Sequence, residues 1–192
     1  MKNQSNNETI IARTRCWIER VVVELNVCPF ARKPYEGGQV RYVVSAANQP
    51  EDLLAEVQRE LELLRATDAG EIETTVLIHP DVLNDFLDYN DFLGVVDGLI
   101  EEAGYQGEFQ VASLHPHYQF AGTEPDAAEN YTNRSPYPIL HLLREAELAR
   151  AIAGYARPDK IPERNIRTLE KLGAARMREI LDECMGIEDS AG

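Results

Sequence analysis

The sequence lacks an apolar run of the roughly 20 residues that a transmembrane helix needs. Its first ten residues, MKNQSNNETI, are polar and lack the apolar core of a secretion signal. The three cysteines, Cys16, Cys28 and Cys184, are widely spaced and include no CxxC pair. These absences predict a cytoplasmic protein with free thiols rather than a secreted protein built on disulfide bonds.

Basic residues are also few, with 19 Lys and Arg against 33 Asp and Glu, and the formal net charge is −14 at pH 7. A nucleic-acid-binding face neutralises phosphates with Lys and Arg, so this balance argues against a nucleic-acid partner. It argues equally against an anionic membrane surface. The 44% hydrophobic content is enough to bury a core. We expect one domain over residues 1–192, with loose ends at residues 1–7 and 186–192.

Apolar periodicity predicts three strands separated by two helices. Residues 40–46, 73–79 and 108–115 are rich in β-branched and aromatic residues, which favour strands. Residues 50–67 and 81–105 have apolar residues at intervals of three and four, which favour helices. The β-α-β-α-β order predicts an α/β fold, with α+β as the neighbouring class and a parallel or mixed core sheet. A ferredoxin-like arrangement is the alternative, and no fourth strand is visible.

Further helices are predicted before and after this core in the sequence. Residues 8–26 form an N-terminal helix by the same periodicity. Two C-terminal helices follow the core, one capped by Ser135 and ending at Gly154, the other over residues 162–184. Prolines make residues 27–34 an extended link in this interpretation.

Two histidines, His79 and His115, stand directly before prolines where predicted strands end. In open α/β sheets, ligands bind outside the carboxyl ends of the strands. A residue before proline is extended, so His115 and His117 should project to the same side. Two such imidazoles can bind one divalent metal ion such as Zn, with His79 as a third ligand if the two strands are neighbours.

The His-x-His pattern is weak by itself, because no HExxH motif and no ordered carboxylates accompany it. One alternative is that His79, His115 and His117 act as acid and base without a metal. Another is that they are strand-end histidines, each hydrogen-bonded to a carbonyl group. The three histidines are therefore predicted both as catalytic residues and as metal ligands, and the cofactor is otherwise unknown.

Residues 118–134 form a long loop, and loops beyond about 12–15 residues are often functional. The loop leads into the predicted helix start, where free N–H groups attract anions and Arg134 can bind a carboxylate or phosphate. The alternative is a capping turn in which Arg134 pairs with Glu129 or Asp126. The predicted substrate-binding residues are Tyr131, Asn133, Arg134 and Ser135.

Two further residues are assigned structural roles. His141 lies within the predicted helix, where it either faces the pocket or packs in the core, and packing is favoured. Cys28 follows a helix and precedes a proline, and a buried structural thiol is favoured over a catalytic one.

Several segments of the chain resemble one known family. These segments are Cys28-Pro29-Phe30-Ala31, His115-Pro116-His117-Tyr118-Gln119-Phe120, Tyr131-Thr132-Asn133-Arg134-Ser135-Pro136-Tyr137-Pro138 and His141-Leu142-Leu143-Arg144. They resemble the bacterial domain-of-unknown-function family 1415, and the match is nearly chain-long. The resemblance implies a stand-alone cytoplasmic protein, and it brings no activity, substrate or cofactor.

The sequence favours a small-molecule enzyme of unassigned reaction class, acting on a small anionic molecule through the histidines and Arg134. One alternative is a non-catalytic ligand-binding or regulatory module that uses the same pocket. A third hypothesis is a structural or interaction protein with scattered histidines and an apolar surface patch. A homo-oligomer is compatible with all three.

Overall fold

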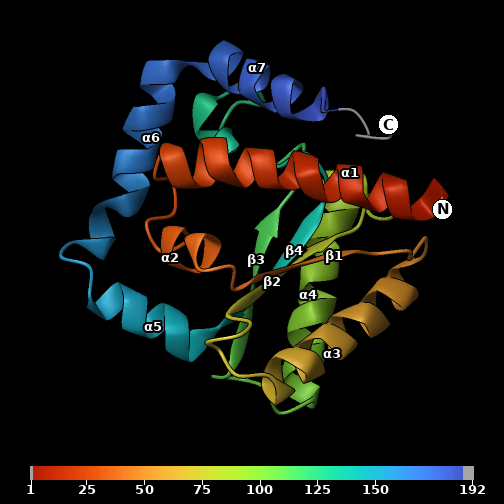
Figure 1. The fold of residues 1–192 in the computed structure, drawn as a ribbon. Helices are drawn as coiled ribbons and strands as arrows, with labels where there is room; N and C mark the ends of the chain where they lie inside the picture. Colours follow the sequence, from red (N-terminus) through yellow and green to blue (C-terminus); the bar gives the residue numbers. More distant parts are fainter. Residues whose placement is uncertain (1, 188–192) are drawn as a thin grey trace.

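A four-stranded mixed sheet lies at the centre of the computed structural model, which describes residues 2–187 (Figure 1). The strand order is β1-β2-β4-β3. Strand β1 is parallel to β2, whereas β4 is antiparallel to both of its neighbours. The strands are β1 (Val40–Val44), β2 (Thr74–Ile78), β3 (Phe109–Leu114) and β4 (Ile139–Arg144).

Helices cover both faces of this sheet. Helix α1 crosses one face with α7 alongside it, and α3 and α4 cover the opposite face (Figure 1). Within the described residues, no helix has the length and apolar character needed to cross a membrane. The helices are α1 (Lys2–Trp17), the π-helix η1 (Ile18–Glu24), α2 (Arg32–Glu36), α3 (Pro50–Ala66), α4 (Phe86–Glu102), the 3-10 helix η2 (Ala128–Thr132), α5 (Glu145–Ala153), the 3-10 turn η3 (Pro158–Lys160), α6 (Ile161–Leu172) and α7 (Ala174–Met185).

The α/β class and the mixed core sheet predicted from the sequence are confirmed. Strands β1, β2 and β3 lie within the three predicted segments, and each is two residues shorter. Helix α3 begins at Pro50, as expected for a proline in a first turn. Helix α4 begins later than predicted, because the Asp85 carboxylate accepts hydrogen bonds from the N–H groups of Leu87 and Asp88.

The predicted helix from Ser135 to Gly154 is wrong in its first half. Residues Ile139–Arg144 form strand β4, and helix α5 begins only at Glu145. A short apolar run such as ILHLLR satisfies both a helical and a strand pattern, so periodicity alone does not separate them. Here β4 pairs with β2 on one side and β3 on the other, and these two backbone ladders favour the strand.

Strand β4 also decides two points of topology that the sequence left open. The strands that carry His79 and His115 at their ends are not neighbours, because β4 lies between them. Their backbones are therefore two strand spacings apart, which is about 10 Å. The ferredoxin-like alternative is wrong, since its β-α-β-β-α-β order differs from the β-α-β-α-β-β order found here.

Three other boundaries differ from the prediction. Residues 27–34 are not wholly extended, because Arg32–Glu36 form α2 with Pro34 in its first turn, where no N–H donor is needed. The last predicted helix is divided into α6 and α7 at Gly173, whose φ of 81° favours glycine. Helix α1 begins at Lys2, so residues 2–7 are helical rather than loose. Of the predicted loose tail, residues 188–192 lie outside the described part of the chain.

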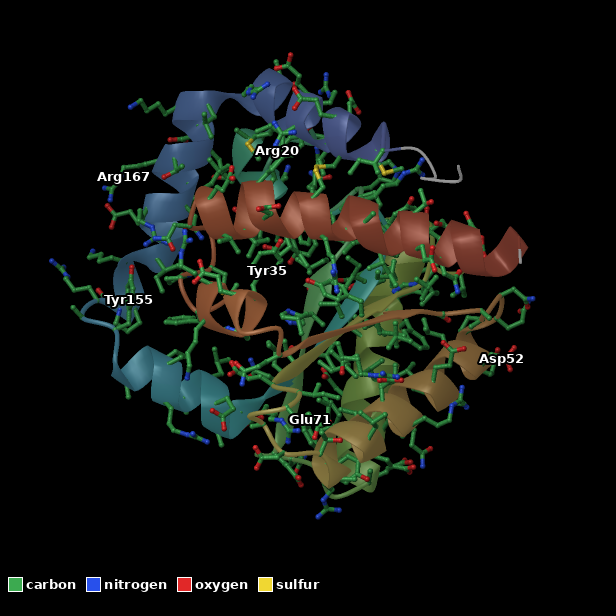
Figure 2. All side chains as sticks on the ribbon, in the orientation of Figure 1. Arg20, Tyr35, Asp52, Glu71, Tyr155 and Arg167 are labelled. Carbon is green, nitrogen blue, oxygen red and sulfur yellow. A yellow bond between two sulfur atoms is a disulfide. The ribbon has the colours of Figure 1, made fainter. Side chains whose placement is uncertain are left out.

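Two apolar cores flank the sheet, one on each face. Alternate residues of β2 point to opposite faces, so Leu77 belongs to the core under α3 and α4, whereas Val76 and Ile78 belong to the core under α1. Side chains fill both layers, and charged groups such as Asp52 and Glu71 lie at the rim (Figure 2). Both faces of the central strands are covered, and this explains the continuous apolar sequence of β2 and β4.

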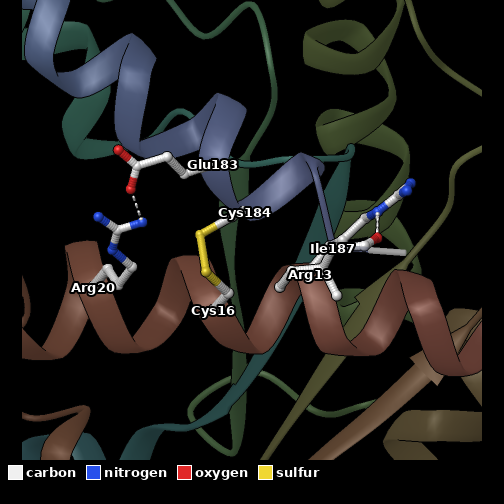
Figure 3. The surroundings of a disulfide bond; sticks show 6 residues. All are labelled: Arg13, Cys16, Arg20, Glu183, Cys184 and Ile187. Atoms are coloured by element: carbon white, nitrogen blue, oxygen red, sulfur yellow. Dashed lines mark hydrogen bonds and ion pairs between the residues drawn. A yellow bond between two sulfur atoms is a disulfide. The ribbon is translucent and has the colours of Figure 1, made fainter. Parts of the chain in front are cut away.

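The expectation of three free thiols is wrong for two of them, because Cys16 of α1 and Cys184 of α7 form a disulfide bond (Figure 3). The same pair of helices is joined by an ion pair between Arg20 and Glu183. Cys28 is the free cysteine. The cytoplasmic location, which rested in part on free thiols, stays a prediction.

We expect the Cys16–Cys184 bond to be a major stabilising link, since it closes a loop with a sequence separation of 168 residues. Replacing both cysteines with serine should lower the free energy of unfolding by about 2–5 kcal/mol, as loss of a long-loop disulfide does. Urea unfolding of the oxidised protein with and without a dithiol reductant measures this loss. The double variant should not respond to the reductant, and equal stability of oxidised and reduced wild-type protein would contradict the bond.

Candidate functional site

A cavity of about 260 Å³ lies between the sheet and the helices on its α1 face. Its floor comes from β2, β3 and β4, and its roof comes from α1 and η1. Helices α2 and α5 form its sides. The side chains of the floor and roof are Thr74, Val76, Ala112, Leu114, His141, Leu143, Trp17, Ile18 and Val22, and those of the sides include Phe30, Ala31, Pro34, Tyr35, Leu148 and Ala151.

The strand register places three of the floor residues in one row across the sheet. His141 of β4 is paired with Val76 of β2 on one side and with Ala112 of β3 on the other. Because side chains alternate along a strand, Thr74 projects to the same face as Val76. The cavity floor therefore has a polar imidazole at its centre with apolar neighbours on both sides.

The roof has an irregular backbone. The first helix changes from α to π geometry at Ile18, and Ile18 and Val22 from this π-helix line the cavity. Continuous π-helices are rare, and they occur often at functional sites. This change of geometry lies in the part of the helix that covers the cavity.

The His141 ring makes one hydrogen bond within the floor. Its Nε2 lies 2.7 Å from the Thr74 Oγ1, and this hydroxyl is also 2.6 Å from the carbonyl oxygen of Leu142. Burial disfavours the charged imidazolium and lowers the pKa of His141 to about 4. His141 is therefore neutral near physiological pH.

One end of the cavity carries charged groups. Burial, with a smaller contribution from nearby Glu147, raises the pKa of the Glu73 carboxyl group. Arg144 lines the same end, but its guanidinium donates to the carbonyl groups of Leu64, Thr67 (2.7 Å) and Ile72 (3.2 Å for Nε). The cation thus caps the end of α3 and is not free to bind an anionic ligand.

The free thiol of Cys28 also lines the cavity. Burial raises its pKa, although the backbone N–H groups of Phe30 and Ala31 oppose the shift. A thiol with a raised pKa is a poor nucleophile, which agrees with the structural role expected for Cys28.

The strand-end histidines lie elsewhere, in an aromatic cluster at the carboxyl ends of β2 and β3. The ring of Tyr89 stands between the two buried histidines, with ring centroids 5.8 Å from His79 and 5.0 Å from His115. The rings of Phe86 and His117 lie 5.4 and 5.8 Å from that of His115. His79 and His115 are buried in this cluster, whereas His117 is exposed, and a common site of the three histidines stays a prediction.

Both buried histidines bind the turn that precedes α4. His79 Nδ1 donates to the Val82 carbonyl at 2.9 Å, and His115 Nε2 donates to the Leu83 carbonyl at 3.2 Å. His115 Nδ1 accepts from the backbone N–H of His117 at 3.0 Å, so neither of its nitrogens is free. Leu83 has a φ of 57°, an unfavourable value for a branched residue, and these bonds stabilise that turn.

The structure does not support the predicted metal site. Among residues 2–187, no group of three or more His, Cys, Asp or Glu side chains is placed to bind a metal ion. The reason is the inserted strand β4, which separates His79 from His115, and the backbone bonds that occupy both nitrogens of His115. The alternative of strand-end histidines bonded to carbonyl groups is confirmed for His79 and His115. The catalytic roles of the three histidines stay predictions.

The predicted anion site at a helix start is not formed, because β4 rather than a helix follows Ser135. Arg134 instead stabilises the long loop, since its Nε donates to the Tyr118 carbonyl at 3.0 Å and its Nη2 donates to that of Pro125. Its guanidinium also lies 4.8 Å from the ring centroid of Tyr131. The expected pairing with Glu129 or Asp126 is absent from the described ion pairs.

The other predicted substrate-binding residues have mainly structural contacts. Asn133 Nδ2 donates to the Ser113 carbonyl at 3.0 Å, and the Ser135 hydroxyl donates to the Tyr137 carbonyl at 2.6 Å. Tyr131 is buried in the core under α1. Asn133 is the member of the predicted set that also lines the cavity, and the substrate-binding role of all four residues stays a prediction.

The sequence interpretation missed the central polar residue of the cavity, His141, because it placed this residue in a helix. One signal was present in the chain. If residues 139–144 are treated as a strand, Ile139, His141 and Leu143 share a face, and the imidazole is the single polar group between two apolar side chains. A polar side chain at the centre of a buried apolar face is informative.

The fold and the cavity define a mixed α/β protein with a mainly apolar pocket that is partly open to solvent. The family model described as "Protein of unknown function (DUF1415)" matches residues 9–179, and the chain therefore belongs to this family. Searches of curated proteins and of solved structures found no match.

Tyr89 should be the main structural residue of the histidine cluster. Its hydroxyl accepts from the Leu114 N–H at 2.9 Å and donates to the Ile139 carbonyl at 2.8 Å, which links β3 to β4. Tyr89→Phe leaves both backbone groups unpaired and should lower the free energy of unfolding by about 1–3 kcal/mol. Urea unfolding measures the loss, and Tyr155→Phe, which removes a hydroxyl paired with Arg164, serves as the control with a smaller effect. Equal losses in the two variants would contradict this role.

Stability should fall in mild acid because His79 and His141 have low pKa values. Burial lowers the pKa of both His79 and His141 from 6.5 to about 4. The unfolded chain therefore binds more protons than the folded protein as the pH falls from about 6.5 to about 4, and the free energy of unfolding decreases there. The full effect approaches about 3 kcal/mol for each histidine.

Denaturant unfolding at a series of pH values measures the slope of the free energy of unfolding against pH. His79→Asn keeps an N–H donor near the Val82 carbonyl but does not titrate, so its slope should be shallower. The exposed, non-titrating change Asn90→Gln should keep the wild-type slope. A stability that is independent of pH across this range would show that the imidazoles are not buried in their neutral forms.

Proposed function

We propose that this protein binds a small, mostly apolar molecule in the cavity between the sheet and α1. The observation that carries the proposal is the size of the cavity, about 260 Å³. Protein interiors are close-packed and contain few voids larger than a water molecule, so a space of this size is not an ordinary packing defect. It approaches the lower limit of small-molecule sites, which is about 300 Å³.

The chemistry of the walls supports an apolar ligand. Binding sites for small molecules are lined mainly by apolar and aromatic side chains, with a few polar groups that orient the ligand. The roof and sides contribute Trp17, Phe30 and Tyr35, and the floor contributes His141 between apolar neighbours. An apolar molecule would gain free energy by leaving water for these walls.

One wall residue has an unsatisfied polar group. The indole Nε1 of Trp17 is buried and has no acceptor among the described residues. A buried donor without a partner costs about 1–3 kcal/mol.

The cavity is built on rigid elements. Its floor is formed by three paired strands, and its roof is tied to α7 by the Cys16–Cys184 bond. Sites built on strands and helices are positioned more accurately than sites on loops. A preformed cavity also reduces the entropy cost of ligand binding.

This proposal corresponds to the ligand-binding alternative from the sequence and moves the site to a different face of the sheet. It favours an uncharged ligand, because Arg134 and Arg144 both donate to backbone carbonyl groups. A small anionic ligand bound at Arg134 stays a prediction.

Titration with 4-tert-butylcyclohexanol tests the proposed site. The fluorescence of Trp17, the single tryptophan of the chain, should change on binding because this residue lines the cavity. Ala112→Leu places a larger side chain on the floor beside His141 and should weaken binding about tenfold or more by filling the space. Ala149→Leu, on the exposed surface of α5, is the matched control and should bind like the wild type.

Urea unfolding of both leucine variants verifies that each is folded. If the alcohol does not change the fluorescence or the stability of the wild-type protein, the proposed function is wrong. If Ala112→Leu and Ala149→Leu bind equally well, the molecule binds outside the cavity.

A further inference from the structure

One hydroxyl group, that of Thr74, determines which ring nitrogen of His141 carries the proton. The Thr74 hydroxyl has a single proton and lies 2.6 Å from the Leu142 carbonyl oxygen. A carbonyl oxygen accepts only, so Thr74 must be the donor in this contact. No second proton remains on this hydroxyl for the His141 ring.

The contact between His141 and Thr74 therefore has a defined direction. At 2.7 Å, Nε2 and Oγ1 are within hydrogen-bond distance, and Nε2 must donate because the hydroxyl proton is already used. A neutral imidazole carries one N–H, so a ring with its proton on Nε2 has a lone pair on Nδ1. The Thr74 hydroxyl thus selects the tautomer in which Nδ1 is an acceptor.

No protein group within residues 2–187 donates a hydrogen bond to Nδ1 of His141. The strand neighbours on this face, Val76 and Ala112, have no polar atoms in their side chains. The ring lines the cavity, so a molecule there can reach the acceptor. An acceptor without a protein donor becomes a selective feature of the cavity when a ligand supplies the donor.

We propose that the ligand of the cavity is an uncharged molecule with an apolar body and a hydroxyl or N–H group that donates to Nδ1 of His141. The inference rests on the proposed function, since it requires a molecule in the cavity. Alcohols, phenols and amides fit this class. Hydrocarbons and ethers lack the donor, and a carboxylate would place its own lone pairs against that of Nδ1.

Thr74 is a positioning residue in this scheme. It lies behind the ring at Nε2 and acts through His141 by keeping Nδ1 unprotonated. The burial that lowers the pKa of His141 supports the same state, because an imidazolium would have no acceptor left for a ligand donor.

A matched pair of ligands tests the inference on the full chain. The pair is 4-tert-butylcyclohexanol and its methyl ether, which share an apolar body and differ in the hydroxyl donor. The alcohol should bind about three- to tenfold more tightly than the ether, the gain expected for one added hydrogen bond. The fluorescence of Trp17 reports both titrations.

Three variants test whether the preference for the alcohol over the ether depends on His141 and Thr74. His141→Phe keeps a ring in the floor but removes the acceptor, so the ether should still bind and the preference for the alcohol should disappear. Thr74→Val removes the group that selects the tautomer and should reduce the preference, whereas a role in packing alone would leave it unchanged. Asn90→Gln, at an exposed position of α4 outside the cavity, should keep the wild-type preference.

Nitrogen NMR of the His141 imidazole gives a second readout that does not depend on ligand affinity. The proton is expected on Nε2 in the free wild-type protein, and the Nδ1 signal should shift when the alcohol binds. A proton on Nδ1 in the free protein would overturn the inference.

The outcomes also separate the two proposals. Equal affinity for the alcohol and the ether would overturn the inference and leave the proposed function standing. Failure of both molecules to bind would overturn the proposed function, and the inference with it. An alcohol preference that persists in His141→Phe would show that another residue recognises the hydroxyl.

Discussion

The insertion of β4 between β2 and β3 is the constraint on which the rest of the structure depends. It completes the backbone hydrogen bonds of both neighbouring strands and places His141 at the centre of the sheet. The same insertion separates His79 from His115 by two strand spacings, and the imidazoles of both donate to backbone carbonyl groups. The pairing of β4 therefore creates the polar centre of the cavity, and no group of three or more metal-binding side chains is found among residues 2–187.

The buried histidines show how similar side chains acquire different roles. His79 and His115 use their N–H donors on the carbonyl groups of the turn before α4, where Leu83 has a positive φ. His141 donates to a hydroxyl on its own sheet and has an acceptor left over. All three have lowered pKa values because burial disfavours the charged ring. Their roles differ because of the partner of each nitrogen, which only the folded arrangement defines.

Much of the architecture could be predicted from local patterns. The first three strands and helix α3 have clear periodicity, and turn residues or prolines mark their ends. Strand β4 could not be predicted in this way, because six residues with four apolar side chains fit either the helical or the strand period. In addition, Ser135-Pro136 resembles a helix start. The pairing of Cys16 with Cys184 could not be predicted either, since their proximity depends on how α1 and α7 pack.

The sequence by itself determined the α/β class, the net negative charge and the first three strands of the sheet. These properties depend on composition and on periodicity. The tertiary structure alone decided that ILHLLR is a strand, that the cavity lies on the α1 face, and that His141 is its polar centre. The reason is that the partners of β4 come from strands at least 25 residues away in the chain, as in the pairing of Leu114 with Ile139, and no local pattern records such pairing.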